Sequence, residues 1–436
     1  MEVVQRSYIA FPAGRAFFIS SNQDLSGSER RRSHERGISM KFTQDMFAVH
    51  MRDINGSAIR EIFKLLAKPG MISFAGGNPS TTALEPEVIS GLAVEVLEKY
   101  GTTLLQYGAT DGFGPFRESA AAFLNTEGVK CTAETLLPVQ GGSQAFDLLL
   151  KALINPGDVI LCESPTFLGA IQAMREYNAK LIPMPTDDGG VIVEAAEELI
   201  KKHHPKMMYV IPTFQNPTGI TLTLERRKAL AELASKYGVV IAEDDPYRDL
   251  RYSGEALPPI QSFDEEGWVV YMSSFSKYIA PGLRLGAAAV NNPLLLRKMV
   301  IGKQSADVHS PLLNQAIVDA YLRKGLMPGH LERICGDYRK QLNAMLECFK
   351  YFPEGTKHTV PEGGLFVWAE LPEGTDVMQI FEPAVEANVA FVPGTHFYTD
   401  GGHLNTMRLN FSMSDVPTIH EGMKRLGEVV TRELNK

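Results

Sequence analysis

The 436-residue sequence has few cysteines, and none of them forms a metal-binding pattern. No two of Cys131, Cys162, Cys335 and Cys348 make a C-x-x-C pair, so neither a disulfide scaffold nor a cysteine-based zinc site is expected. The ten histidines do not include the H-E-x-x-H pattern of zinc proteases. We therefore expect no metal site.

Long apolar runs and an excess of positive charge are also missing. No stretch approaches the ~20 apolar residues of a membrane-spanning helix. The most apolar early segment, residues 9–19, is interrupted by Pro12, Gly14 and Arg15, which makes it a poor signal peptide. Lys plus Arg is 43 and Asp plus Glu is 51, a formal net charge of −8 that argues against a general polyanion-binding role. The sequence predicts a cytoplasmic protein that binds neither nucleic acid nor membrane.

Residues 1–39 differ in composition from the rest of the chain. They hold six arginines, three of them consecutive, among polar residues with almost no apolar periodicity. This pattern predicts a disordered N-terminal extension. It is compatible with an upstream extension, with a segment added for expression, or with a transit peptide, although the acidic residues present argue against the last.

The remainder alternates between short apolar runs and helical stretches. Runs without polar alternation predict strands that are buried on both faces, so we expect an α/β protein with a mostly parallel sheet. The predicted strands include residues 136–139, 158–162, 207–211, 238–242 and 269–272, and the predicted helices include residues 143–154 and 225–237. After about residue 320, long helical patterns (329–352 and 417–434) flank a short strand (364–368), which predicts a separate α+β domain.

The segment from Ser274 to Gly286 carries the strongest chemical signal. It places Lys277 just after a predicted buried strand, where an ammonium group is costly to bury. A lysine with a lowered pKa can instead form a Schiff base with an aldehyde cofactor. The hydroxyls of Ser274 and Ser276 and the guanidinium of Arg284 suit a phosphate monoester. Taken alone, the segment is equally compatible with a solvated loop lysine.

Two further segments lie at strand ends. Gln140-Gly-Gly-Ser143-Gln144 joins a strand to a helix, where backbone N–H groups and the helix dipole favour an anion, although a plain helix cap is the alternative. It is not the G-x-G-x-x-G dinucleotide fingerprint. Asp244 follows another predicted strand. Ligands bind at this edge of a parallel sheet, which favours a functional carboxylate, and the alternative is a solvated acidic loop.

Two more polar patterns complete the candidate site. Asn216-Pro-Thr-Gly219 follows the predicted strand 207–211, and taken alone this pattern predicts a turn. Arg408 lies in a predicted strand between apolar neighbours, where it would bind a carboxylate or form an interface salt bridge.

Together these segments resemble the pyridoxal-phosphate (PLP) enzymes of fold type I, and specifically the class I/II aminotransferases. The resemblance covers roughly residue 42 to the C-terminus. The motifs occur in the family's order, with 28 residues from Asn216 to Asp244 and 33 from Asp244 to Lys277. The Asp-x-Pro-Tyr form and the segment Phe74–Pro79 are most similar to the kynurenine/2-aminoadipate, aromatic and branched-chain aminotransferases.

The resemblance implies a fold and a domain organisation. We expect a mostly parallel seven-stranded sheet sandwiched by helices, together with a smaller α+β domain. The expected division is a disordered extension (1–39), an N-terminal arm joining the small domain (40–69), a large PLP-binding domain (70–320) and a small domain (321–436).

The resemblance also implies roles for individual residues. Lys277 would hold PLP and move the substrate proton, Asp244 would pair with the pyridine nitrogen, and Asn216 and Tyr247 would bond the ring oxygen. Phe167 would stack on the ring. The phosphate would be held by Ser143, Gln144, Ser274, Ser276 and Arg284.

Other expected contacts concern the substrate and the assembly. Arg408 would bind the substrate α-carboxylate, with Gly77, Asn78 and Asn216 lining the substrate pocket. Tyr107 would reach the phosphate of a neighbouring subunit, which implies a homodimer with shared active sites.

The resemblance predicts an aminotransferase with a ping-pong mechanism. It would move an amino group from an L-amino acid, aromatic, branched-chain or 2-aminoadipate-like, to a 2-oxo acid such as 2-oxoglutarate. Two alternatives use the same motifs. One is a PLP-dependent C–S β-lyase, and the other is a non-catalytic PLP-binding regulator, although about 40 preceding residues are too few for a winged-helix module.

Overall fold

The computed structural model describes residues 42–52 and 70–436. The first segment, considered by itself, contains the short 3-10 helix η1 (Gln44–Met46) and the single turn α2 (Val49–Arg52). The predicted extension 1–39 lies outside the described residues, as does most of the predicted arm 40–69. The predicted domain bounds therefore stay a prediction.

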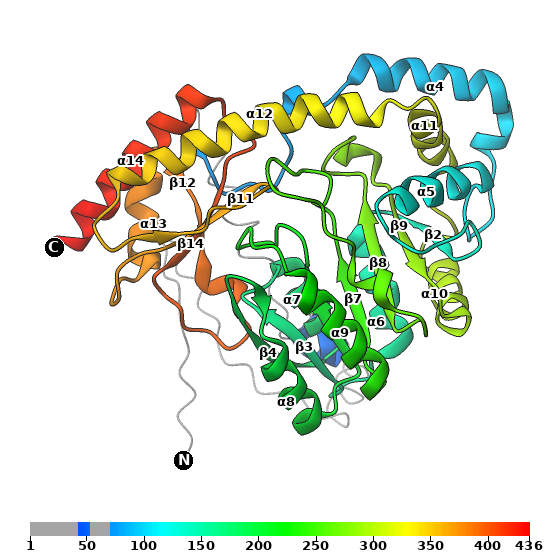
Figure 1. Ribbon diagram of the computed structural model, residues 1–436, viewed down its shortest axis with the longest axis horizontal. Helices are drawn as coiled ribbons and strands as arrows, with labels where there is room; N and C mark the ends of the chain where they lie inside the picture. The colour runs from blue at the N-terminus through cyan, green and yellow to red at the C-terminus, as the bar shows by residue number, and fades with distance from the viewer. Residues whose placement is uncertain (1–41, 53–69) are drawn as a thin grey trace, which may run out of the picture. The chain divides into compact units, whose positions relative to one another are not determined.

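Eight strands form the large sheet in the order β2-β9-β8-β7-β6-β3-β4-β5 (Figure 1). Neighbours from β8 to β4 run parallel, whereas β9 is antiparallel to both of its neighbours. The mostly parallel α/β sheet is confirmed, and it has one short strand beyond the predicted seven, because β5 folds back antiparallel on the end of β4. The strands are β2 (Leu136–Val139), β3 (Val159–Ser164), β4 (Lys180–Asp187), β5 (Gly190–Val191), β6 (Met207–Val210), β7 (Val240–Asp244), β8 (Val269–Ser274) and β9 (Gly286–Val290).

Helices cover both faces of this sheet. Successive residues of a strand point to opposite faces, so Met207 and Tyr209 of β6 pack with one helix layer while Met208 and Val210 pack with the other. This two-sided burial explains why the central strands begin with continuous apolar runs, with polar residues only toward their carboxyl ends. The first layer comprises α6 (Gly142–Leu153), α7 (Leu168–Glu176) and α10 (Pro293–Ala306), and the second comprises α8 (Val193–His203) and α9 (Leu224–Tyr237).

Helix α9 shows how local sequence sets the element bounds. The Thr223 hydroxyl accepts a hydrogen bond from the Arg226 backbone N–H and so caps the N-terminus. Gly238 ends the helix in the left-handed conformation, with φ of 65°, where a glycine has no Cβ to clash. The predicted helix 225–237 is confirmed to within one residue.

The C-terminal region forms a second, antiparallel sheet in the order β10-β11-β14-β13. Helices α12 and α14 lie side by side against this region (Figure 1). A short parallel pair, β1 with β12, joins the start of the described 70–436 segment to it. The elements are β1 (Ile72–Ser73), β10 (Lys357–His358), β11 (Phe366–Glu370), β12 (Val389–Ala390), β13 (Val392–Pro393), β14 (Thr406–Asn410), α12 (Met327–Glu347), α13 (Val377–Glu386) and α14 (Val416–Leu434).

Three further helices pack on one another beside the β2 edge, with α11 contacting both α4 and α5. They are α4 (Pro86–Tyr100), α5 (Gly114–Thr126) and α11 (Leu312–Arg323), and the remaining 3-10 turns are η2 (Thr81–Ala83), η3 (Gly101–Leu105), η4 (Ile260–Phe263), η5 (Pro281–Leu283), η6 (Cys348–Tyr351) and η7 (Gly394–Phe397). Within the described ranges, no helix has both the length and the apolar character needed to cross a bilayer.

Candidate functional site

A pocket of about 270 Å³ opens at the carboxyl edge of the large sheet, and we call it the carboxyl-edge pocket. Parallel strands that end at one edge bring their following residues together, and ligands of α/β sheets bind there. The pocket brings together every predicted site residue except Gln144 and Tyr107. Its lining residues are Gly77, Asn78, Gly142, Ser143, Phe167, Ile211, Asn216, Asp244, Pro246, Tyr247, Ser274, Ser276, Lys277, Arg284, Phe366 and Arg408.

Lys277 supplies a primary amine to this pocket. It lies three residues beyond β8, and its Nζ donates a hydrogen bond of 2.7 Å to the Gly77 carbonyl. Burial, together with the positive charges of Arg408 and Arg284, lowers the pKa of Lys277 to about 8. A sizeable fraction of this amine is therefore neutral near physiological pH, and a neutral amine is nucleophilic.

Asp244 is the carboxylate of the pocket. It is the last residue of β7, and its Oδ2 accepts a 2.6 Å hydrogen bond from the Tyr209 hydroxyl on the neighbouring strand β6. Burial raises the pKa of Asp244 to about 6, while the Tyr209 hydrogen bond and the charge of Lys277 act in the opposite direction. The group is thus largely ionised at neutral pH and is held in a fixed direction.

Arg408 is a buried guanidinium that enters the pocket from β14. Its Nη1 donates to Asn216 Oδ1 and its Nη2 to the Ala75 carbonyl, each at 2.8 Å. The rings of Phe366 and Phe397 lie 4.2 and 5.1 Å from the guanidinium carbon. Burial lowers the pKa of Arg408 to about 10, so the group stays charged at neutral pH. Its Nε is buried without a hydrogen-bond partner, which suits a further acceptor such as a carboxylate.

Asn216 and Tyr247 form a pair beside Arg408. The Asn216 amide nitrogen donates to the Tyr247 hydroxyl at 3.4 Å, and both side chains are buried. Burial raises the pKa of the Tyr247 phenol, which keeps its proton at neutral pH. The pair therefore offers two neutral donors to the pocket.

An anion cradle lies where β2 leads into α6. The Arg284 guanidinium bonds the Gln140 carbonyl at 3.1 Å and Ser276 Oγ at 3.4 Å. A Cβ at Gly141 would lie only 2.8 Å from Arg284 Nη2, so the cradle requires a glycine, and its φ of 83° requires one too. The N-terminus of α6 faces the same cradle, and a helix N-terminus together with a guanidinium suits a phosphate.

Gln144 stays a predicted ligand of the phosphate, and its side chain is bound elsewhere in the structure. Its side chain points toward α10, where Oε1 accepts from Lys303 Nζ at 2.9 Å and Nε2 donates to Asp307 at 2.7 Å. The physical reason is Lys303, a fully buried ammonium that must find acceptors. Gln144 also accepts from the Gln140 backbone N–H, so it braces the cradle from behind.

Tyr107 lies outside the pocket of its own chain. Its side chain is 81% exposed and its ring meets His309 edge-on, with centroids 6.1 Å apart. Tyr107 is therefore not among the residues that line the pocket of its own chain.

Several lining residues were not predicted. Ile211 immediately follows β6 and Pro246 lies two residues beyond β7, so their position after strand ends was the available signal. Phe366 is in a predicted strand, but its packing against Arg408 joins two distant segments. Gly169 leaves room for the ring of Phe167, which was predicted, because a Cβ at Gly169 would lie 2.6 Å from that ring.

The residues present fit PLP. The cradle suits its phosphate, the Asp244 carboxylate suits a protonated ring nitrogen, and the Lys277 amine suits its aldehyde. A Cβ at Gly142 would lie 3.3 Å from Asp244 Oδ1, so the glycine leaves room between the helix end and the carboxylate. Within the described part of the chain, no group of three or more His, Cys, Asp or Glu residues could hold a metal ion.

Comparisons with known proteins agree with this chemistry. The family described as "Aminotransferase class I and II" matches residues 69–426. Aromatic-amino-acid aminotransferase 1 of Thermococcus litoralis is 42% identical over 390 residues, covering 88% of this chain and 93% of that protein. The crystal structure of Pyrococcus horikoshii kynurenine aminotransferase in complex with PMP is 40% identical, with a TM-score of 0.86 over 90% of this chain and 98% of that one.

A second solved structure also contains a cofactor derivative. The α-aminoadipate aminotransferase LysN of Thermus thermophilus, complexed with N-(5′-phosphopyridoxyl)-L-leucine, is 37% identical. Its TM-score is 0.83, and the match covers 90% of this chain and 98% of that one.

Proposed function

Because the chain belongs to the class I and II aminotransferases, and is therefore a PLP-dependent transaminase, we propose that its donor is an aromatic, branched-chain or 2-aminoadipate-like L-amino acid. The acceptor is a 2-oxo acid such as 2-oxoglutarate. The relatives named above are all aminotransferases, so the alternative of a C–S β-lyase on the same fold is not favoured.

The observation that carries the proposal is the convergence of Lys277, Asp244 and Arg408 on one pocket. An amine with a lowered pKa, an oriented carboxylate and a buried guanidinium are the three groups that transamination of an α-amino acid needs. Groups with pKa values moved by burial gather at functional sites.

The ring-contacting residues have separate tasks. PLP, when bound, supplies an electron sink for the negative charge that develops at the substrate Cα. Asp244 would hold the proton on the pyridine nitrogen, and Asn216 and Tyr247 would donate to the ring oxygen O3′. Lys277 would hold the cofactor and carry the proton at the substrate Cα, which requires its neutral amine. Phe167 would pack on the ring face.

The phosphate ligands are assigned to the anion cradle. Ser143, Ser274, Ser276 and Arg284 would bond the phosphate together with the first N–H groups of α6. We assign Gln144 a bracing task through Gln140 in place of a direct side-chain contact.

The substrate contacts follow from the remaining groups. Arg408 would bind the α-carboxylate common to donor and acceptor, with Gly77, Asn78 and Asn216 beside it. The cations among the described lining residues are Lys277, Arg284 and Arg408, and each already has a task.

A homodimer and a cytoplasmic location are part of the proposal. The exposed position of Tyr107 supports a task outside its own chain's pocket, on the phosphate of a second subunit. The cytoplasmic location rests on the charge and apolar pattern of the sequence.

A panel of amino donors with 2-oxoglutarate as acceptor tests the proposed function. We expect aromatic or branched-chain donors to convert the visible absorption of the holoenzyme to that of the pyridoxamine form, and glutamate to be formed. Release of pyruvate and a thiol from a cysteine conjugate, without a 2-oxo acid, would identify a β-lyase. Bound PLP with no turnover of any donor would identify a regulator.

Replacing Arg408 by glutamine is expected to lower kcat/KM for donor and acceptor alike. Truncating one partner of a buried charged pair costs about 2–5 kcal/mol, which predicts a loss on the order of 10²- to 10³-fold. Steady-state kinetics with both substrates measures this. Arg227→Gln, at another buried arginine that bonds the Leu222 carbonyl outside the pocket, is the control. A rise in KM for only one substrate contradicts the assignment of Arg408 to their shared carboxylate.

The uptake of PLP by the apo-protein is expected to depend on pH with a midpoint near 8. Below this pH Lys277 is protonated and cannot bond the aldehyde, so the rate rises with pH and levels off once the amine is neutral. Stopped-flow absorption at several pH values measures the midpoint. Arg408→Gln removes a charge that lowers the lysine pKa, so its midpoint moves upward. A wild-type midpoint near 10.5, the ordinary lysine value, is the contrary result.

A further inference from the structure

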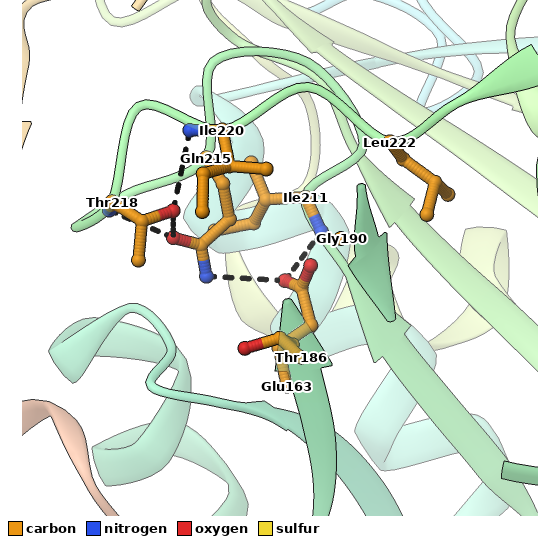
Figure 2. A pocket seen from close by; sticks show the side chains of 8 residues that line it. All are labelled: Glu163, Thr186, Gly190, Ile211, Gln215, Thr218, Ile220 and Leu222. Atoms are coloured by element: carbon orange, nitrogen blue, oxygen red, sulfur yellow. Dashed lines mark hydrogen bonds between the residues drawn. The ribbon is translucent and has the colours of Figure 1, made fainter. Parts of the chain in front are cut away.

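A second, much smaller cavity is lined by residues of the loop that follows β6 and by Glu163 of β3 (Figure 2). Its volume is about 10 Å³, room for about one water molecule, so it is no ligand site. Its walls include buried polar side chains, and these hydrogen-bond to the loops that also carry residues of the carboxyl-edge pocket. The lining residues are Glu163, Thr186, Gly190, Ile211, Gln215, Thr218, Ile220 and Leu222.

Glu163, near the end of β3, forms the base of this set. Its Oε2 accepts hydrogen bonds from the Ile211 backbone N–H at 2.9 Å and from Gln215 Nε2 at 3.4 Å (Figure 2). Burial raises the pKa of Glu163 to about 8, so the side chain carries its proton at neutral pH. A neutral acceptor in this position is compatible with complete burial.

Gln215 uses both ends of its side-chain amide to join two loops. Its Oε1 accepts from the backbone N–H and the hydroxyl of Thr218, at 2.9 and 2.8 Å, within the loop that follows β6. Its Nε2 donates to the Pro165 carbonyl at 2.8 Å, in the loop that follows β3. We call this side chain, seated on Glu163, the Gln215 clamp.

Each joined loop carries a residue of the carboxyl-edge pocket. Asn216 is adjacent to Gln215 and accepts from Arg408, and Phe167 lies two residues beyond Pro165. The clamp is therefore a direct hydrogen-bonded link between the loop holding Asn216 and the loop holding Phe167. Neither Gln215 nor Glu163 is among the residues that line the carboxyl-edge pocket.

We propose that Gln215, supported by Glu163, is a positioning residue of the transaminase, which fixes the separation of Asn216 from Phe167 and thereby the seat of the cofactor ring. The inference rests on the proposed tasks of Asn216 and Phe167. A displacement of the order of 1 Å at such a seat lowers the rate on the order of 10²-fold.

The test uses the holoenzyme and the Gln215→Leu variant, which keeps the side-chain bulk and removes the clamp. We expect kcat to fall on the order of 10- to 10²-fold with KM for the 2-oxo acid changed by less than about threefold. We also expect the PLP dissociation constant to rise about tenfold as hydrogen bonds are lost. The pKa at which the bound cofactor's absorption changes is expected to move by about 0.5 or more, because Asn216 is displaced.

Two further substitutions keep the test decisive if Gln215→Leu folds poorly. Gln215→Met has neither an acceptor for Thr218 nor a hydrogen for the Pro165 carbonyl, so it is expected to show the same changes. Glu163→Gln keeps a neutral acceptor for Ile211 and Gln215 and is expected to behave as wild type, whereas Glu163→Leu is expected to resemble Gln215→Leu.

The matched control is Gln261→Leu. Gln261 is also fully buried, and its amide also joins two segments, through the backbone N–H and carbonyl of Lys130 at 2.8 Å each, but it lies outside both cavities. If Gln215→Leu lowers the melting temperature as Gln261→Leu does but leaves the cofactor absorption titration and PLP affinity at wild-type values, the positioning role is overturned. If wild type itself shows no donor-dependent absorption change, the proposed function fails instead.

Discussion

The Lys277→Ala variant is expected to lose the visible absorption of the holoenzyme and at least about 10⁴-fold in kcat, the upper range for one positioned proton-transferring group. No other amine lines the described pocket, because its remaining cations are the guanidinium groups of Arg284 and Arg408. Absorption spectra after addition of PLP, and single-turnover rates with a donor, measure the two losses.

Two variants control for the loss of charge and bulk at Lys277. Lys277→Arg keeps the positive charge but stays protonated at any working pH, so it should be as inactive as alanine. Lys206→Ala removes a lysine whose Nζ bonds Asp158 and the Leu153 carbonyl away from the pocket, and it should keep full absorption. Retention of the visible band in Lys277→Ala would contradict the assignment.

The Asp244→Asn variant is expected to lower kcat on the order of 10²- to 10⁴-fold, since breaking a buried charged pair costs about 3–5 kcal/mol. Asparagine keeps the shape and still accepts from Tyr209, but it has no charge to hold a proton on the ring nitrogen. The effect should therefore fall on the chemical step, measured as the single-turnover rate, more than on PLP affinity.

Glu243 gives a matched control for Asp244. It is the neighbouring residue of β7, so its side chain points to the opposite face of the sheet, where it accepts from the backbone N–H groups of Ile260 and Gln261. Glu243→Gln should keep the wild-type single-turnover rate, whatever it does to stability. Equal rate losses in Asp244→Asn and Glu243→Gln would show that a general disturbance of β7 is responsible.

The sequence predicted the positions of the buried strands and the functional groups that follow them. An apolar run that ends in a lysine or a carboxylate is a local pattern, and it located Lys277 and Asp244 correctly at strand ends. Strand β9 was not predicted because its residues, Gly286 to Val290, are mostly alanine, which has no strand preference of its own. Its place between β2 and β8 is decided by tertiary packing.

The direction of a polar side chain could not be predicted where its partner is distant in sequence. The Gln144 side chain points away from the pocket, because its Oε1 accepts a hydrogen bond from the buried ammonium of Lys303, 159 residues later in the chain. Likewise, Gln215 meets Glu163 across 52 residues, and no pattern around either residue indicates the contact. The predicted contact of Tyr107 is with the phosphate of a neighbouring subunit, and it stays a prediction.

The buried guanidinium of Arg408 has a practical consequence for handling the protein. A buried, desolvated guanidinium that lines the pocket attracts any small carboxylate, whether or not it is a substrate. Acetate, formate and citrate buffers would then compete with amino acids during assays, and crystals grown from them would contain the pocket in a blocked state. Buffers that contain neither a carboxylate nor a primary amine are the appropriate choice for kinetics and for crystal soaking, because a primary amine would itself react with the cofactor aldehyde.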